Sequence, residues 1–295
     1  MAARSGRKTV TIVGLGLIGG SLAFAWKDAG FFDQVFALTR KEETLSKAVA
    51  SGAIDRGFTA PGPWLSETDA LVLATPVGSL LYLLDACLPY LSPGCAITDV
   101  GSVKQTIVRG AERRTQGVHY FLGGHPMAGS EKSGFDSARS DLFHRATYVL
   151  TPTSRTRDED LEFWSAAAEA VKARVLIMDA EEHDRTVAWT SHLPLLVACS
   201  LSQASIRGNR NNPNFKPLIA GGFRDTTRVA SGEPQMGADM CSFNRHAILE
   251  ALQGFRASLD ELEHLLAASG EDREPLRAAL ETIKHDRDQL VEGGF

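Results

Sequence analysis

Short apolar runs alternate with amphipathic stretches along the first 179 residues of this chain. The runs are rich in β-branched and aliphatic side chains and predict strands over residues 10–13, 34–38, 70–74, 95–100, 118–122, 147–150 and 174–178. The stretches between them predict helices over residues 19–29, 42–50, 80–88, 103–113 and 157–172. Such regular alternation indicates the α/β class, with a doubly wound and mostly parallel sheet.

The pattern changes after Asp179, because residues 180–295 carry helical periodicity and no convincing strand. Helices are predicted over residues 183–204, with Pro194 as a candidate kink, and over residues 245–268 and 274–291. The polar, Asn-rich residues 207–216 predict a loop. We therefore expect two domains, 1–179 and 180–295, and we expect the long apolar helix faces of the second to be buried in a homodimer.

Composition narrows the function classes. The net charge of −5 gives no reason to expect nucleic acid or an anionic membrane as a partner. Pro76 and Gly78 interrupt the longest apolar stretch, residues 71–84, so no membrane span is expected. The four cysteines are scattered without a C-x-x-C pair, which gives no metal site and suits a reducing compartment. Without an apolar targeting segment in the first residues, a cytoplasmic protein is predicted.

A G-x-G-x-x-G motif follows the first predicted strand directly and opens the first helix; its residues are Gly14, Leu15, Gly16, Leu17, Ile18 and Gly19. In this context the motif predicts a Rossmann-type dinucleotide site at residues 1–179. Gly14 allows the tight turn, Gly16 lets a pyrophosphate approach the backbone, and Gly19 lets helix and strand pack closely. Thr75 and Pro76, which follow the strand over residues 70–74, are also predicted to contact the cofactor. A glycine-rich turn without a ligand is the alternative.

The end of the second strand predicts which dinucleotide is bound. An NAD enzyme usually carries Asp or Glu about 20 residues after the motif, where it binds the ribose 2′-hydroxyl. This chain has Thr39, Arg40 and Lys41 there, with no acid before Glu42. A hydroxyl and two cations suit a 2′-phosphate, so NADP is predicted over NAD. In the alternative, Arg40 and Lys41 are a solvated helix start.

Three further segments carry candidate chemistry. Ser102 lies just after a predicted strand, at the edge where doubly wound sheets bind ligands, although it equally suits a helix N-cap. His125 stands between glycines and a proline, where little surrounds it to make it core filling, and it is a candidate general base. Arg224 and Arg228 follow two glycines and are candidates to bind carboxylates, with Arg224 the better fit to a plain surface arginine.

Five segments, in this order, resemble motifs of the prephenate/arogenate dehydrogenase family: G-L-G-L-I-G-G-S-L, D-V-G-S-V-K, G-G-H-P-M-A-G-S-E-K-S-G, H-D-x-x-V-A-W-x-S-H-L-P and G-F-R-D-T-T-R-V-A. They span roughly residues 9–245, and the Thr-Arg ending of the second strand is similar to the NADP-using, arogenate-preferring branch. The resemblance implies an oxidative decarboxylation in tyrosine biosynthesis, catalysed by a dinucleotide domain followed by an all-helical dimerisation domain.

The resemblance also implies roles for single residues. His125 is similar to the catalytic histidine that binds the substrate ring hydroxyl, and Ser102 to the serine that helps hold that hydroxyl and the nicotinamide. His192 matches a second active-site histidine, while His183 is assigned to a helix start. The resemblance also implies that Arg228 binds the substrate carboxylate, with Arg224 as its reserve, and that Glu131 influences substrate choice.

The sequence leaves three other activities as alternatives. An NAD-dependent prephenate dehydrogenase differs only in its cofactor. A β-hydroxyacid dehydrogenase shares the two-domain outline but relies on a lysine in the long interdomain helix, and residues 183–204 contain none. A non-catalytic dinucleotide-binding regulator would keep the glycine motif and need neither His125 nor Arg228.

Overall fold

The computed structural model describes residues 6–129, 132–270 and 272–292, and its helices and strands divide into two compact units, Met1–Arg245 and His246–Phe295. The first unit contains an eight-stranded sheet with the order β3-β2-β1-β4-β5-β6-β7-β8. Its strands are β1 Thr9–Val13, β2 Gln34–Leu38, β3 Arg56–Phe58, β4 Ala70–Leu73, β5 Ala96–Asp99, β6 Tyr120–Pro126, β7 Thr147–Thr151 and β8 Arg174–Ile177. All neighbouring strands are parallel except β6 and β7, so the predicted Rossmann-type sheet is confirmed.

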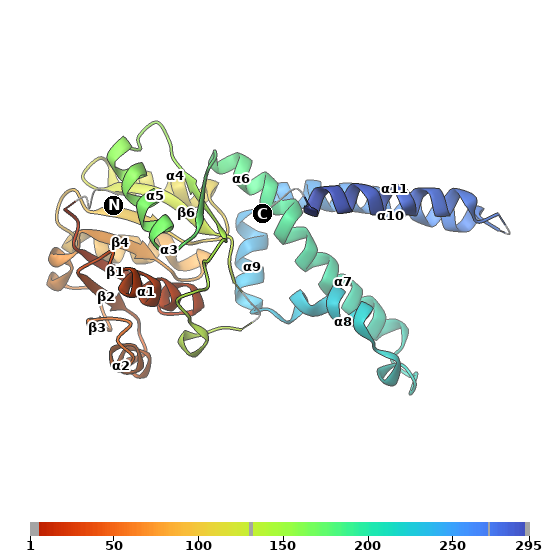
Figure 1. Ribbon diagram of the computed structural model, residues 1–295, viewed down its shortest axis with the longest axis horizontal. Helices are drawn as coiled ribbons and strands as arrows, with labels where there is room; N and C mark the ends of the chain where they lie inside the picture. The colour runs from red at the N-terminus through yellow and green to blue at the C-terminus, as the bar shows by residue number, and fades with distance from the viewer. Residues whose placement is uncertain (1–5, 130–131, 271, 293–295) are drawn as a thin grey trace. The chain divides into compact units, whose positions relative to one another are not determined.

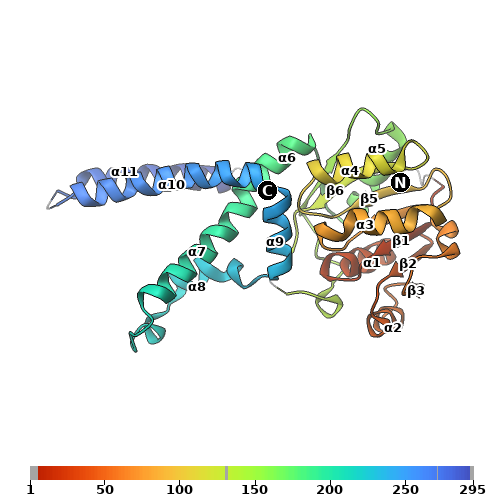
Figure 2. The ribbon, with the colours of Figure 1, turned by 180° about the vertical axis from the view of Figure 1, so that it is seen from behind.

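Helices cover both faces of this sheet (Figures 1 and 2). They are α1 Leu17–Ala29, α2 Glu42–Ala50, α3 Val77–Cys87, α4 Gln105–Thr115 and α5 Asp158–Ala170. On one face, α1 and α5 meet through Trp26, which is 1% exposed and donates its indole N–H to the Ala167 carbonyl at 2.9 Å. On the other face, the buried Leu80 and Leu84 of α3 join the core formed with α4. These two cores hold the strand ends that form the site in fixed positions.

Among the described residues that follow the sheet, the regular elements are all helices, as predicted. Within the first unit they are α6 Ala180–Val187, α7 Leu193–Gly208, α8 Gly221–Thr227 and α9 Pro234–Phe243. The second unit consists of α11 Glu274–Glu292 and nearly all of α10 Arg245–Ala268. Among the described residues, no helix is both long enough and apolar enough to cross a membrane.

The structure corrects several predicted elements. The continuous helix over residues 183–204 is instead α6 and α7 joined by a π-helical turn, Ala188–His192, and Pro194 lies in the first turn of α7, where its missing N–H costs no helical hydrogen bond. The strand β3 was not predicted, because Arg-Gly-Phe is too short to show alternation. The helices α8 and α9 were also missed, since Gly221 and Gly222 are poor helix formers that hid the start of α8.

Candidate functional site

The glycine motif forms a cradle of bare backbone at the end of β1. Gly14 has φ +102°, and a Cβ built on it would lie 2.6 Å from the Ala74 carbonyl oxygen. A Cβ on Gly19 would lie 2.0 Å from the Gly14 carbonyl oxygen, whereas a Cβ on Gly16 would meet nothing within 4 Å. The outer two glycines are therefore needed for packing of the chain itself. Gly16 faces open space, which is where a pyrophosphate would approach the backbone.

This cradle fits a dinucleotide. Gly16 is the N-cap of α1, and no side chain caps that end, so the first N–H groups of the helix have no intrahelical acceptor and suit phosphate. The end of β2 lies beside the cradle, because the Gly14 N–H donates to the Leu38 carbonyl at 2.8 Å. Just beyond, Thr39 is half-buried and Arg40 is exposed. Hydroxyl and guanidinium groups thus follow the strand that borders the cradle.

Thr75 and Pro76 lie on the other side of the cradle, between β4 and α3. The Thr75 methyl group would lie 2.7 Å from a Cβ on Gly14, so this turn touches the glycine loop. The Ser79 hydroxyl donates to the Thr75 hydroxyl at 3.0 Å, and Pro76 is the N-cap of α3. Both residues are therefore placed at the carboxyl edge of the sheet, next to the predicted cofactor loop.

A buried ion pair lies at the same edge, between β5 and β6. Lys104 and Asp99 are fully buried and joined by an ion pair, and the Lys104 ammonium also donates to the Gly124 carbonyl at 2.6 Å. Burial lowers the pKa of Lys104, an effect that the charge of Asp99 opposes. Asp99 in turn accepts the Gly101 N–H at 2.9 Å and the Gly124 N–H at 3.2 Å. These contacts connect the turn after β5 to the strand that carries His125.

Ser102 lies in that turn, half-buried, and it is not the N-cap of α4. The helix begins at Gln105, two residues later than predicted, and its first N–H groups are bound from another element: the Asp184 carboxylate accepts the Lys104 N–H at 2.7 Å and the Gln105 N–H at 2.9 Å. The N-cap explanation for Ser102 is therefore wrong, because Asp184 of α6 supplies the cap.

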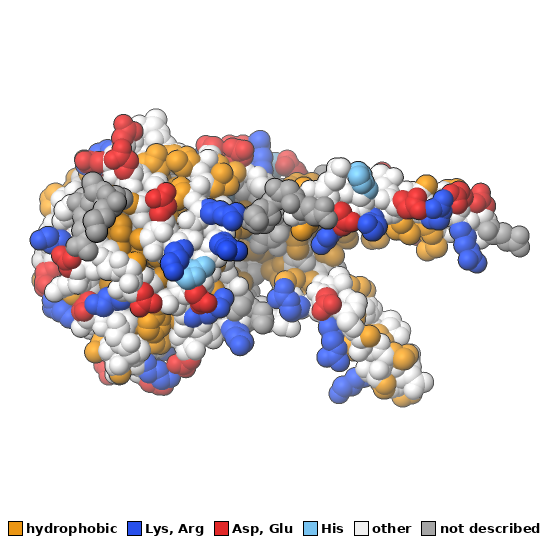
Figure 3. All heavy atoms as spheres, in the orientation of Figure 1, with side chains coloured by type: hydrophobic (Ala, Val, Ile, Leu, Met, Phe, Trp, Pro, Cys, Tyr) orange, Lys and Arg blue, Asp and Glu red, His pale blue; other side chains and the backbone are white. Residues whose placement is uncertain are grey.

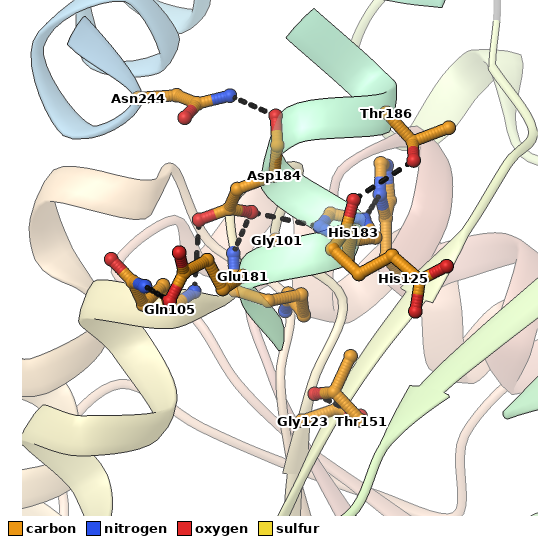
Figure 4. Close-up of polar contacts among 12 residues, drawn as sticks. Gly101, Gln105, Gly123, His125, Thr151, Glu181, His183, Asp184, Thr186 and Asn244 are labelled. Carbon is orange, nitrogen blue, oxygen red and sulfur yellow. Dashed lines mark hydrogen bonds and ion pairs between the residues drawn. The ribbon is translucent and has the colours of Figure 1, made fainter. Parts of the chain in front are cut away.

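His125 lies near the end of β6, half-buried, and contacts a second histidine. Its Nδ1 is 2.8 Å from Nε2 of His183, and the two rings meet edge to face at an interplanar angle of 71°. His183 is fully buried in α6, and its Nδ1 is 2.8 Å from Oδ1 of Asp184 (Figure 4). The predicted helix start at His183 thus also forms part of the site.

Electrostatics keep the His125 ring uncharged. Burial lowers the pKa of His125 well below its usual range, and His183, Lys104 and His192 each lower it further. A buried cation would have to be stabilised here against another cation, which is unfavourable. At neutral pH this imidazole is therefore a proton acceptor.

His192 is the third histidine of this region and is fully buried at the end of the π-helical turn. Burial is the main cause that lowers its pKa to about 4. Its Nδ1 is 3.0 Å from the side-chain amide nitrogen of Asn244, which also donates to the Asp184 carbonyl at 2.7 Å. Its Nε2 makes no hydrogen bond to any described residue, although the Ser102 backbone is close enough to affect the ring. A buried ring nitrogen without a hydrogen-bond partner calls for an explanation, and a bound ligand is one such explanation.

The two predicted arginines lie on the segment that follows Gly221 and Gly222. Arg224 lies on α8, and Arg228 begins the 3₁₀ turn that follows it; both are exposed. These two segments pack along α7, as Figure 1 shows for α8, and no described contact joins Arg224 to the histidines. Glu131 falls outside the described residues.

Asp99, Lys104, His183, Asp184 and Asn244 are the residues of the candidate site that sequence reasoning missed. Asp99 and Lys104 lie in a segment that was singled out, but nothing in the sequence showed that they pair in the interior. Among the residues that the structure describes, no group of three or more His, Cys, Asp or Glu side chains is placed to hold a metal ion. The arrangement instead combines an uncharged base, an open dinucleotide cradle and a buried polar network that fixes both.

Comparisons with known proteins agree with this arrangement. The profile of the "Prephenate dehydrogenase, nucleotide-binding domain" matches residues 22–177, and that of the "Prephenate dehydrogenase, dimerization domain" matches residues 179–282. Prephenate dehydrogenase of Bacillus subtilis is 34% identical over 96% of this chain and 76% of its own length.

Two solved structures extend the match. Arogenate dehydrogenase of Synechocystis superposes with a TM-score of 0.80 at 36% identity, over 96% of this chain and all of that one (100%). Prephenate dehydrogenase from A. aeolicus, in complex with hydroxyphenyl propionate and NAD+, gives a TM-score of 0.90 at 32% identity, over 96% of this chain and 98% of that one. With both halves matched in order, the chain belongs to the prephenate dehydrogenase family of NAD(P)-dependent oxidoreductases.

Proposed function

We propose that this enzyme oxidatively decarboxylates arogenate to tyrosine, or prephenate to 4-hydroxyphenylpyruvate, with NADP as the hydride acceptor. The observation that carries the proposal is the uncharged, half-buried His125 at the end of β6, at the same sheet edge as the dinucleotide cradle. A base for an alcohol proton and a site for a hydride acceptor at one edge are what this reaction requires.

In the proposed reaction, His125 accepts the proton of the substrate ring hydroxyl. A dinucleotide held by the glycine cradle would supply the acceptor for the hydride of the same ring carbon. As the carbonyl forms, the substrate loses CO₂ and its ring becomes aromatic. Because aromatisation drives the reaction, the main task of the protein is to position the substrate and to polarise its hydroxyl group. Because its pKa is lowered, His125 stays able to accept the proton below pH 6.5, so the acid limb of kcat/KM lies below that of an ordinary histidine.

Two further groups are proposed to hold the substrate at this edge. Ser102 is not needed as a helix cap, so its hydroxyl is available for the ring hydroxyl and the nicotinamide. His192 offers the unpartnered Nε2, which a polar substrate group would satisfy. Arg228 is proposed to bind the ring carboxylate, with Arg224 kept as its reserve, and Glu131 to influence the choice between the two substrates.

The preference for NADP is proposed from the end of β2. Arg40 is exposed beside the cradle, in a position to pair with a 2′-phosphate, and no acidic residue stands between Leu38 and Glu42 to bind a free 2′-hydroxyl. The preference for arogenate is proposed on the resemblance to the NADP-using branch. Michaelis constants for both cofactors test the first point, and a strong preference for NAD would refute it.

The domain plan and assembly are proposals too. We place the domain boundary near residue 179, with a dinucleotide-binding domain over 1–179 and a helical substrate and dimerisation domain over 180–295, in a cytoplasmic homodimer. Exposed apolar side chains on the helices support burial against a second copy, and Figure 3 shows hydrophobic patches on them. The exposed apolar side chains of these helices include Leu201, Ile206, Leu259, Leu266, Leu280 and Ile283. A monomeric sedimentation profile at micromolar concentration would contradict the dimer.

The decisive experiment supplies the purified enzyme with arogenate or prephenate and with NADP or NAD, and follows formation of the reduced cofactor by absorbance. We expect turnover in at least the arogenate and NADP combination, with release of CO₂. No turnover in any of the four combinations, together with retained dinucleotide binding, would favour a non-catalytic dinucleotide-binding regulator instead.

A further inference from the structure

A chain of three polar side chains runs from the candidate base into the interior. It leads from His125 of β6 to His183 of α6, and from there to the neighbouring Asp184, with 2.8 Å at each step. His183 is fully buried, with 0% relative exposure, and Asp184 is 6% exposed. Water therefore does not compete for these contacts, and both ring nitrogens of His183 and Nδ1 of His125 each have one partner that decides whether the nitrogen carries a proton.

The direction of these hydrogen bonds follows from Asp184. Each of its carboxylate oxygens accepts a backbone N–H, one from Lys104 and one from Gln105, as an ionised carboxylate does. The ring nitrogen of His183 that faces this carboxylate, Nδ1, must then carry the proton and donate it. In a neutral imidazole the other nitrogen is an acceptor. Nε2 of His183 therefore accepts a hydrogen bond from His125.

The same logic then fixes the base. Nδ1 of His125 faces an acceptor, so it carries the proton of that neutral ring. Nε2 of His125 is left with its lone pair, on the side of the ring away from His183. An isolated histidine would populate both tautomers, and only one of them presents Nε2 as a base.

We propose that His183 and Asp184 are positioning residues that hold His125 in the tautomer with a proton on Nδ1, so that Nε2 is the atom that accepts the substrate hydroxyl proton. The inference rests on the proposed function, because it assigns an atom to the base proposed there. It adds two residues that do not touch the substrate and act only through His125.

The proton balance of the step is simple. The O–H bond of the substrate breaks and an N–H bond forms at Nε2 of His125, while the proton on Nδ1 stays in place. The imidazolium that results donates to His183, and the Asp184 carboxylate behind His183 stabilises the positive charge. No further acceptor is needed during the step.

The charged and titratable groups that face His125 come from four segments of the chain. Asp99 of β5 and Lys104, just before α4, form an ion pair with each other, and His192 of the π-helical turn is uncharged above about pH 4. Asp184 of α6 is thus the one carboxylate in this described cluster that is not paired with a lysine or arginine. It is the counter-charge that reaches His125, through His183.

The direct test is the protonation state of each ring nitrogen of His125, measured by ¹⁵N NMR on the intact enzyme at neutral pH. The signals are assigned by their loss in His125→Asn. We expect Nδ1 to be protonated and Nε2 to be of the unprotonated type. A proton on Nε2 in the free enzyme would overturn the inference. This measurement involves no turnover and requires no variant of His183 that must fold.

A pair of variants supplies the kinetic test. His183→Gln keeps an acceptor for the His125 N–H and should retain most of the turnover, whereas His183→Leu removes it. In His183→Leu we expect kcat to fall by roughly tenfold or more, though by less than the roughly 10²–10⁴-fold loss of the whole base, with KM nearly unchanged. Equal and near-normal kcat values for the two variants would overturn the inference.

A control separates this role from the general loss of a buried histidine. His119 is 7% exposed, burial lowers its pKa, and it lies before β6, at the opposite end of that strand from His125. His119→Leu should leave kcat and the NMR signals of His125 unchanged. The proposed function and this inference are contradicted by different results. Normal turnover in His125→Asn would contradict the proposed function. A proton on Nε2 of His125, together with a lowered kcat in His125→Asn, would contradict this inference alone.

Discussion

The dinucleotide cradle and the histidine cluster lie at the same sheet edge but are built in opposite ways. The cradle is bare backbone from one short segment, and it works because Gly14, Gly16 and Gly19 have no side chains. The cluster is made of buried side chains brought together from β6, α6 and the residues around α4. A local site of this kind depends on steric space, and a non-local one depends on complete hydrogen bonding in a dry interior.

The largest effect is expected from replacing His125, the proposed general base of the histidine cluster. His125→Asn should lower kcat by roughly 10²–10⁴-fold, the usual contribution of general base catalysis, while dinucleotide and substrate binding persist. Steady-state kinetics and a binding titration of the dinucleotide measure the two effects. Near-normal turnover would remove His125 from the proposed role.

The cluster should also make the fold sensitive to acid. The pKa of His192 is about 4 in the folded protein and about 6.5 when the chain unfolds, so the unfolded state takes up the proton first as pH falls. The stability is complete above pH 6.5 and declines toward pH 4, by about 3 kcal/mol from this group.

Denaturant unfolding at a series of pH values measures that decline. His192→Gln, which cannot take up a proton, serves as the comparison and should show a shallower loss. An equally steep loss in both proteins would show that His192 does not govern the acid limb of stability.

Substitutions of the exposed arginines test whether a solvent-exposed side chain contributes to substrate binding, in contrast to the buried histidine cluster. Arg228→Ala should raise KM for the substrate by roughly ten- to a hundredfold, because a hydrogen bond to a charged group contributes about 1.5–3 kcal/mol. Arg224→Ala is the matched control on the same segment and should change KM little. The reverse result would transfer the carboxylate role to Arg224.

Two glycine substitutions separate packing from ligand approach within the cradle. Gly19→Ala places a methyl group 2.0 Å from the Gly14 carbonyl oxygen, so it should destabilise the fold by roughly 1–3 kcal/mol. Gly16→Ala meets nothing within 4 Å and should leave the unfolding temperature unchanged while weakening dinucleotide binding. Unfolding curves and dinucleotide titrations measure both, and equal destabilisation by the two changes would contradict the assigned roles.

The smallest expected effect concerns cofactor choice. Arg40→Ala should raise KM for NADP on the order of tenfold, at the lower end for a charged hydrogen bond, and leave KM for NAD unchanged. Lys41→Ala tests the second cation of the same segment and should raise KM for NADP by a smaller factor. A parallel rise for both cofactors would mean that Arg40 does not recognise the 2′-phosphate.

The same contrast explains what could be predicted from the sequence. The glycine motif and the strand before it are contiguous, so their geometry is encoded locally and was predicted in detail. His125 could be selected as a candidate base from the sequence because glycines and a proline flank it. Its partner His183 is 58 residues away, and the carboxylate that caps α4 is 80 residues from Lys104, so neither link leaves a pattern in the sequence.

The Asp184 contacts with α4 have a consequence for any attempt to separate the two halves of the chain. A fragment ending at residue 179 would retain the glycine cradle, yet the first turn of α4 would lose the carboxylate that binds the N–H groups of Lys104 and Gln105. The histidine cluster at this edge would lose His183 and His192 together with that acid. A chimera that replaces the helical half therefore has to carry an acidic residue at this place to remain a working enzyme.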